Sequence, residues 1–316
     1  MTTMRQHGAA AVMTVLAGLC ASPRAEQTAV GSATVTVLAP AIAEAKVYKL
    51  LPGFDHRDAF EASGVQYRDG VFYVVFDNRY EIARIGAELP HNSKANTLEG
   101  ASGSGSGFEG ITWDSHGTEN LYVVIETAPR HGAYYARIRE YDIDLDYQGS
   151  EWTDHAFPWR QRNKGIEGIA WVRRHGEDYL LGIIEGSGTV LVMQQHGEHW
   201  QTVARIPAPV DFGDYSDIAI DGNGRVAITS QEDARLWIGR LSDGAWAYTG
   251  PGEIYALPEG DRDGHVGNGG YRIYGNIEGV SWIGERRVVL VSDRRKASQP
   301  AYTRHKDQSI HIFDLP

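Results

Sequence analysis

The feature that most constrains this chain is a short motif that returns at intervals of about 45 to 60 residues. Three clear copies read Glu-Gly, a β-branched residue, a small polar or apolar residue and Trp, and they lie in Phe108–Trp113, Ile166–Trp171 and Ile277–Trp282. Two weaker copies are Ser63–Tyr67 and Tyr215–Ile220. Repeats at such spacings are typical of β-propellers, in which each repeat forms one blade. The chain is therefore predicted to be all-β.

A second strand is predicted after each motif, because a turn and a short apolar run follow it. These runs are Phe72–Phe76, Leu121–Ile125, Leu180–Ile184, Val226–Ser230 and Val288–Ser292. An acidic or amide residue ends each run, namely Asp77, Glu126, Glu185, Gln231 and Asp293. Antiparallel pairing places the end of the second strand beside the start of the first. We therefore expect ten equivalent positions to converge on one face, with carboxylates at eight of them if Asp217 is matched to Glu109, Glu167 and Glu278.

Five blades are predicted, and a sixth, degenerate blade within Glu232–Asn276 is the alternative. The last motif is followed by only two further strands, Val288–Ser292 and Ser309–Leu315, so its blade lacks an outer strand. Val47–Leu51 is apolar and precedes Pro52, as the outer strands of other blades precede a proline. We expect this segment to close the ring and leave no free sheet edge, within one propeller domain that covers residues 45–316.

The N-terminus has the pattern of a secretory signal peptide over residues 1–25. Arg5 precedes the small, apolar stretch Gly8–Ala21, and cleavage is expected near Ala25. The mature protein would then be periplasmic or secreted, begin with a leader over residues 26–44, and lack Cys20, the single cysteine. Such a protein has no disulfide and no thiolate metal ligand.

The charge of the chain restricts its partners. The formal net charge is −11, and it becomes −13 when Arg5 and Arg24 leave with the signal peptide. Nucleic acids and anionic membranes are therefore unfavourable partners. No second apolar stretch approaches the roughly 20 residues of a membrane helix. We expect a monomer that binds a small-molecule substrate.

Eight convergent carboxylates must be neutralised, because two charges 4 Å apart repel by about 4 kcal/mol at an effective dielectric constant near 20. One solution is a hard cation, and calcium is the expected one because it accepts oxygen ligands in irregular arrangements. Its predicted ligands are Glu109, Glu167, Asp217 and Glu278. A second is a raised pKa, which would make Glu109, Glu167 and Glu278 candidate catalytic acids. A third is structural, in which a Glu before Gly accepts backbone N–H groups of the neighbouring blade.

Other candidates lie on the links that are predicted to rise on the same face. His265 is a candidate catalytic base, with His131 and His305 as alternatives. The residues predicted to bind substrate are Asp77, Arg79, Glu126, Lys164, Glu185, Asp293 and Arg294. Arg79, Lys164 and Arg294 would either neutralise the acids or bind phosphate or carboxylate groups. Trp113, Trp171 and Trp282 are expected to pack between blades.

The repeated Glu-Gly-Ile/Val starts, and Ala62–Val65 with Val74–Asn78, resemble the esterase-like phytase family and the related SdiA-regulated family. These are exported bacterial β-propellers of the calcium-dependent phosphotriesterase-like superfamily, and the resemblance spans residues 60–316. In lactonases and gluconolactonases of that superfamily, a Glu at the Glu-Gly position holds calcium together with Asn and Asp residues. The resemblance implies calcium at Glu109, Glu167 or Glu278 with Asp217 and Asn78.

Three functions fit these observations. The first is a hydrolase of a phosphoester, ester or lactone that uses a cation in the acidic funnel. The second is a glycoside hydrolase with a carboxylate pair about 5 to 9.5 Å apart. The third is a noncatalytic propeller that binds a small molecule or a peptide.

Overall fold

The computed structural model describes residues 34–158, 160, 164–267 and 269–316. The predicted signal peptide, Cys20 and the first part of the predicted leader lie outside the described residues. Export and the cleavage site stay predictions.

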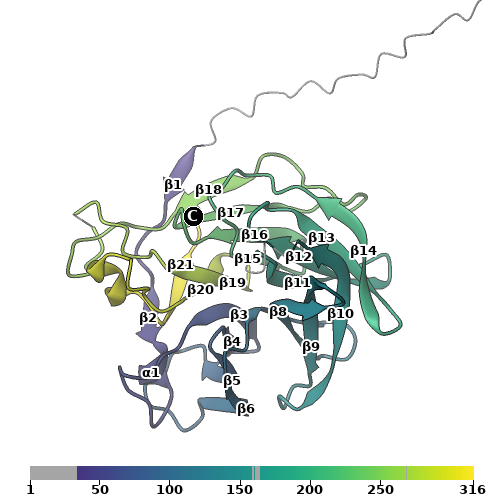
Figure 1. The fold of residues 1–316 in the computed structure, drawn as a ribbon. Helices are drawn as coiled ribbons and strands as arrows, with labels where there is room; N and C mark the ends of the chain where they lie inside the picture. Colours follow the sequence, from purple (N-terminus) through teal and green to yellow (C-terminus); the bar gives the residue numbers. More distant parts are fainter. Residues whose placement is uncertain (1–33, 159, 161–163, 268) are drawn as a thin grey trace, which may run out of the picture. The chain divides into compact units, whose positions relative to one another are not determined.

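Strands that follow one another along the chain pair antiparallel in groups of four (Figure 1). The first group contains β3 (Ala62–Arg68), β4 (Val71–Phe76), β5 (Arg79–Gly86) and β6 (Thr97–Ser104). The second contains β7 (Phe108–Trp113), β8 (Leu121–Arg130), β9 (Ala133–Tyr141) and β10 (Tyr147–Phe157). The third contains β11 (Ile166–Arg174), β12 (Glu177–Ile184), β13 (Val190–His196) and β14 (His199–Ile206). The fourth contains β15 (Asp217–Ile220), β16 (Arg225–Ser230), β17 (Arg235–Arg240) and β18 (Glu253–Ala256).

The first strand of every group lies at the centre. β3, β7, β11, β15 and β19 (Ile277–Ile283) contact one another in a closed cycle. This is the arrangement of a β-propeller, so the predicted all-β propeller fold is confirmed. The outer strands β10 and β14 pair in parallel at Trp152 with His199 and join two groups into one sheet.

An N-terminal strand closes the ring, as predicted, but not with the predicted residues. The last group combines β19, β20 (Arg287–Ser292) and β21 (Ser309–Asp314) with β2 (Ala43–Lys46), which pairs antiparallel with β21. The prediction of a strand at Val47–Leu51 is wrong, because Val47–Leu50 forms the short helix α1. Both Val47 and Leu50 are fully buried, so the apolar pattern reflects helix packing against the core.

The segment predicted to be a leader also contributes a strand. β1 (Val35–Val37) pairs in parallel with β18 as a fifth strand of that sheet. Val35 and Val37 are exposed, so β1 adds little to the core.

Glycine at the second motif position allows the central strands to approach closely. A Cβ atom at Gly110 would lie 2.7 Å from the backbone nitrogen of Ile169, and one at Gly279 would lie 2.8 Å from the Cα of Gly64. Real Cβ atoms essentially never come this close to backbone. The Glu-Gly repeat is thus a packing requirement of the axis as well as a source of carboxylates.

The motif tryptophans pack between neighbouring groups, as predicted. Trp171 of β11 stacks on Tyr122 of β8, with ring centroids 5.0 Å apart. The Arg68 guanidinium lies 4.2 Å from the Trp113 ring centroid, and the Arg225 guanidinium lies 4.4 Å from that of Trp282. These contacts lie at the opposite ends of the central strands from the motif glutamates.

Candidate functional site

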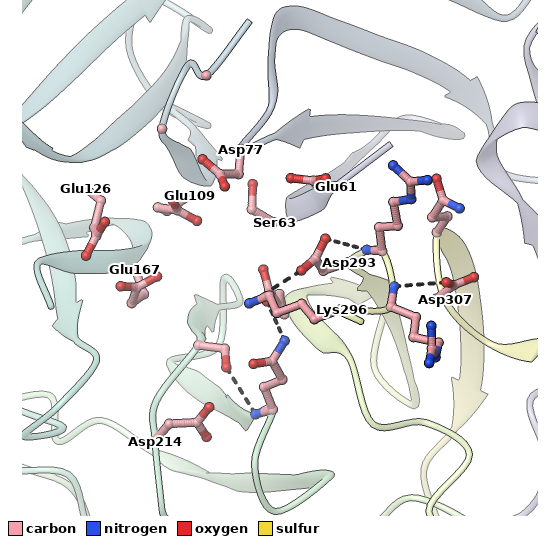
Figure 2. Close-up of a pocket in the computed structure, with 18 of the residues that line it drawn as sticks. Glu61, Ser63, Asp77, Glu109, Glu126, Glu167, Asp214, Asp293, Lys296 and Asp307 are labelled. Atoms are coloured by element: carbon pink, nitrogen blue, oxygen red, sulfur yellow. Dashed lines mark hydrogen bonds and ion pairs between the residues drawn. The ribbon is translucent and has the colours of Figure 1, made fainter. Parts of the chain in front are cut away.

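One end of the ring of central strands opens into a polar cavity of about 1080 Å³. Its lining includes the residue before the motif glycine in three groups, Glu109, Glu167 and Glu278, and Ser63 at the same place in β3. It also includes the residues that follow the second strands, namely Asp77, Glu126, Glu185, Gln231 and Asp293. Figure 2 shows several of these carboxylates around one space. The cavity therefore unites positions that are up to about 230 residues apart in the chain.

β-bulges help to turn the motif side chains toward the cavity. In β11 and β19 the pairing register shifts across Glu167 and Glu278, so each is an extra residue opposite the partner strand. An extra residue bends its strand and changes the direction of its side chain. Ser63 occupies the same place in β3.

The match of Asp217 to the motif glutamates is wrong by one residue. Asp217 pairs with Thr229 without a bulge and stands at the glycine position of the motif, while Ser216 lines the cavity. The Asp217 side chain is buried, and its two oxygens accept hydrogen bonds from the backbone N–H groups of Ile218 (2.8 Å) and Val280 (2.7 Å). Asp217 thus bridges two central strands, as the structural alternative predicted for a motif carboxylate, and its assignment as a metal ligand is withdrawn.

Three other predicted site residues do not line the cavity. Arg79 lies over the Phe60 ring at 4.6 Å and donates a hydrogen bond to the backbone oxygen of Ala59. Lys164 forms a 2.9 Å ion pair with Glu185 beside the cavity. His265 is exposed and pairs with Asp261 at 3.0 Å. The alternative bases His131 and His305 are also absent from the lining.

The position of the insertion that contains His265 explains why this histidine does not line the cavity. Instead of covering the opening, the insertion packs on the β20–β21 link, where Tyr271 and Tyr302 are in ring contact at 5.0 Å. The link itself provides Arg294, Arg295, Lys296 and Arg304 to the cavity lining. The sequence predicted this link on the acidic face, with site roles for Arg294 and, as an alternative base, for His305.

The cavity holds more negative than positive side chains. Ten carboxylates line it, among them Glu61, Asp214 and Asp307, which the repeat pattern did not indicate, against five lysines and arginines. Burial, followed by the charges of Asp77 and Glu278, raises the pKa of Glu109 well above its ordinary value. No hydrogen bond or ion pair to the Glu109 carboxylate occurs among the described residues. The floor of the cavity therefore lacks full charge compensation.

The other floor carboxylates are perturbed in the same direction. Burial raises the pKa of Glu167 and Glu278 well above the ordinary value, and neighbouring carboxylates add to both shifts. Burial raises the pKa of Asp293 to about 7, although Lys296 and the Arg294 N–H oppose the shift. Glu126 accepts a 2.9 Å hydrogen bond from the Gly165 N–H, yet burial keeps its pKa raised. Several of these groups can hold a proton near neutral pH.

Some lining residues have defined partners. Asp307 is buried and pairs with Lys46 at 2.8 Å, and Asp214 accepts a 2.5 Å hydrogen bond from Ser230 Oγ. Gln231 Nε2 donates a 2.5 Å hydrogen bond to Glu278 Oε1. The amide at this position of the repeat thus orients one floor carboxylate.

A serine, a histidine and a glutamate also align outside the cavity. Ser292 Oγ lies 3.3 Å from His311 Nε2, and His311 Nδ1 lies 3.0 Å from Glu44 Oε2. Ser292 and His311 are buried, and Ser292 Oγ already donates to the backbone oxygen of Lys306 at 2.6 Å. None of the three lines the cavity. Because Glu44 lies on β2, this network belongs to the closure of the ring rather than to catalysis.

The donor chemistry of the cavity suits a hard cation, because carboxylate oxygens are the ligands that calcium prefers. However, no three floor carboxylates among the described residues have oxygens that all lie within 4.8 Å of one another. Within the described residues, the only group of three ligand atoms that lie within 4.8 Å of one another is Asp261, Asp263 and His265. A cation on the floor would therefore need inward rotation of the glutamates or water molecules as additional ligands.

Solved structures with a similar fold include proteins of several activities. Regucalcin, a calcium-binding protein of Agrobacterium tumefaciens, is 10% identical, with 90% of this chain and 96% of that chain covered and a TM-score of 0.49. A glutaminyl cyclase of Myxococcus xanthus is 11% identical, with 87% and 97% covered and a TM-score of 0.47. The PQQ-bound aldose sugar dehydrogenase of Streptomyces coelicolor is 13% identical, with 87% and 99% covered and a TM-score of 0.44.

These similarities concern the fold alone and carry no argument about activity. The sequence matches no protein-family profile and no curated protein. Among the described residues, no helix has the length and hydropathy of a membrane span.

Proposed function

We propose that this protein is an exported propeller hydrolase, five-bladed and related to the esterase-like phytase and SdiA-regulated families, that cleaves an ester bond in an anionic small molecule. A phosphoester, a carboxylic ester and a lactone are the candidate bonds. The observation that carries this proposal is the division of the cavity into an acidic floor and a cationic rim. Four of the five cationic side chains in the lining come from the β20–β21 link, namely Arg294, Arg295, Lys296 and Arg304.

The two parts of the cavity have complementary tasks in this proposal. The rim binds the anionic group of the substrate, since guanidinium groups bind phosphate and carboxylate with two hydrogen bonds. The floor binds a divalent cation, for which Glu126, Glu167 and Glu278 are the available ligands when Glu109 keeps its proton. Bound calcium would polarise the scissile group or lower the pKa of a water molecule. Asp217 is excluded from this set by its bonds to backbone N–H groups.

A protonated floor carboxylate can donate a proton to the leaving oxygen. Glu109 is the strongest candidate because burial and four neighbouring acids, Asp77, Glu278, Glu126 and Asp293, all raise its pKa. General acid catalysis of this kind contributes about 10²- to 10⁴-fold to a rate.

The glycosidase alternative requires two carboxyl groups about 5 to 9.5 Å apart. The ten carboxylates of the lining are compatible with such a pair, so the preference for ester cleavage rests on the cationic rim. The cationic rim has no evident task with a neutral sugar.

The test is an assay of purified protein with p-nitrophenyl phosphate, p-nitrophenyl acetate and a δ-lactone, with added calcium and with EDTA. We expect hydrolysis of at least one substrate and a loss of roughly 10²-fold or more in kcat for Glu109→Gln. The matched control is Glu88→Gln, which changes an exposed glutamate outside the cavity. Absence of hydrolysis with every substrate, or equal loss in both variants, would refute the proposal.

A further inference from the structure

Lys296 reaches the acidic floor from a firmly held backbone. Its N–H donates a 2.7 Å hydrogen bond to Gln299 Oε1, which also accepts one from Asn276 Nδ2 at 3.0 Å. The preceding N–H, that of Arg295, donates to Asp307 Oδ2 at 2.9 Å. The Lys296 side chain nevertheless remains 62% exposed, so its position on the cavity wall is fixed at the backbone while its ammonium can still move.

The ammonium lies among the carboxylates of one side of the floor. Lys296 Nζ is 3.8 Å from Asp293 Oδ2, and Figure 2 shows the side chain extending toward the shared space. Burial lowers the pKa of Lys296, but the charges of Glu278, Asp293, Asp77 and Glu109 outweigh burial and raise it overall. These carboxylates therefore keep the ammonium in its charged form. The same carboxylates would attract a divalent cation.

On the opposite side of the floor, no lysine or arginine of the described residues lines the cavity beside Glu126 and Glu167. The donor to Glu126 is the neutral Gly165 N–H, at 2.9 Å. The nearest lysine there, Lys164, pairs with Glu185 and does not line the cavity. Within the described residues, Glu185 is thus paired with a lysine outside the cavity lining, whereas Asp293 and Glu278 interact with a lysine that belongs to the lining.

We propose that Lys296 is a specificity-determining residue whose ammonium takes the place of a cation beside Asp293 and Glu278 and limits how many divalent ions the cavity binds. This inference rests on the proposed function, because that function supplies the divalent cation. Lys296 then acts as a tethered counter-ion that divalent ions must displace or avoid.

Calcium titration calorimetry of Lys296→Met and the wild type tests the inference without any substrate. Met keeps the length of the side chain and removes its charge. Lys94→Met is the matched control, because it makes the same change at an exposed lysine that does not line the cavity. Thermal melting in EDTA shows that all three proteins are folded.

We expect Lys296→Met to bind one more calcium ion per chain than the wild type, or to bind calcium about ten-fold more tightly, since removal of one charge near a divalent ion is worth at least about 1.4 kcal/mol. Lys94→Met should match the wild type. Equal stoichiometry and affinity in all three proteins, including no binding by any, would overturn the inference, as would an equal gain in the control. Hydrolysis by the wild type is measured separately, so a failure here leaves the proposed function to its own assay.

Discussion

Replacing Glu44 by Gln should weaken the closure of the ring, because this one carboxylate on β2 contacts three side chains from the C-terminal part of the chain. Glu44 pairs with Lys306, lies 3.0 Å from His311 Nδ1, and accepts a 3.1 Å hydrogen bond from the Tyr274 hydroxyl. Lys306 and His311 are both buried. The Gln variant keeps the shape of the side chain but leaves the Lys306 ammonium without its counter-charge.

The cost follows from the burial of these partners. Loss of one partner of a buried ion pair costs about 3–5 kcal/mol. The Glu44 side chain is 34% exposed, so water screens part of the interaction and about 2–3 kcal/mol is the better expectation. At roughly 2–4 °C per kcal/mol for a large domain, the Tm should fall by about 4–12 °C.

The pH dependence provides a second measurement. Burial raises the pKa of Glu44, but His311 and Lys306 outweigh burial and lower the pKa from 4.5 to about 2. The stabilisation is therefore complete above pH 4.5 and is lost as the pH falls through about 2. Urea denaturation of the wild type and Glu44→Gln should show a larger difference in unfolding free energy at pH 7 than at pH 3. Equal stability of the two proteins at pH 7, with Glu88→Gln as the control, would refute this account of the closure.

Four further predictions concern the ring and the floor. Deletion through Lys46 removes β1 and β2 and should destabilise the fold severely, whereas deletion through Val30 should leave the melting curve unchanged. Gly168→Ala should prevent folding or lower the Tm strongly, because its Cβ would lie 2.6 Å from the Cα of Asp217; Gly176→Ala, a turn position with no atom within 4 Å, shows how much a positive φ alone costs. Asp217→Ala should cost about 1–3 kcal/mol in urea denaturation yet leave calcium affinity unchanged, and a large loss of affinity would restore Asp217 as a ligand. Burial raises the pKa of Asp293 from an ordinary 3.8 to about 7, so the contribution of this group to stability is complete below pH 3.8 and is lost as the pH rises through 7. Calcium should therefore raise the Tm more at pH 8 than at pH 5. An equal shift of the Tm at the two pH values would contradict this role of Asp293.

The sequence by itself determined the propeller fold and the shared face of its acidic positions. The Glu-Gly repeat predicted where the central strands begin, and strand alternation with antiparallel pairing predicted that Glu109 and Glu126, or Glu278 and Asp293, lie near each other. These predictions depend on local regularities that every repeat has in common. They hold because a blade is a local unit whose strands are adjacent in the chain.

Tertiary structure alone decided which side chains face the cavity in the irregular places. Asp217 looked equivalent to Glu167, but it lacks the bulge that turns Glu167 toward the cavity, and a bulge depends on pairing rather than on composition. Val47–Leu50 had the apolar pattern of a strand, but contacts with the core made it a helix. Lys296 could be placed on the acidic face from sequence, whereas its reach to Asp293 depends on how Gln299 and Asp307 hold a long link. Such long-range contacts have no signature in a single repeat, and they determine the charge balance of the cavity.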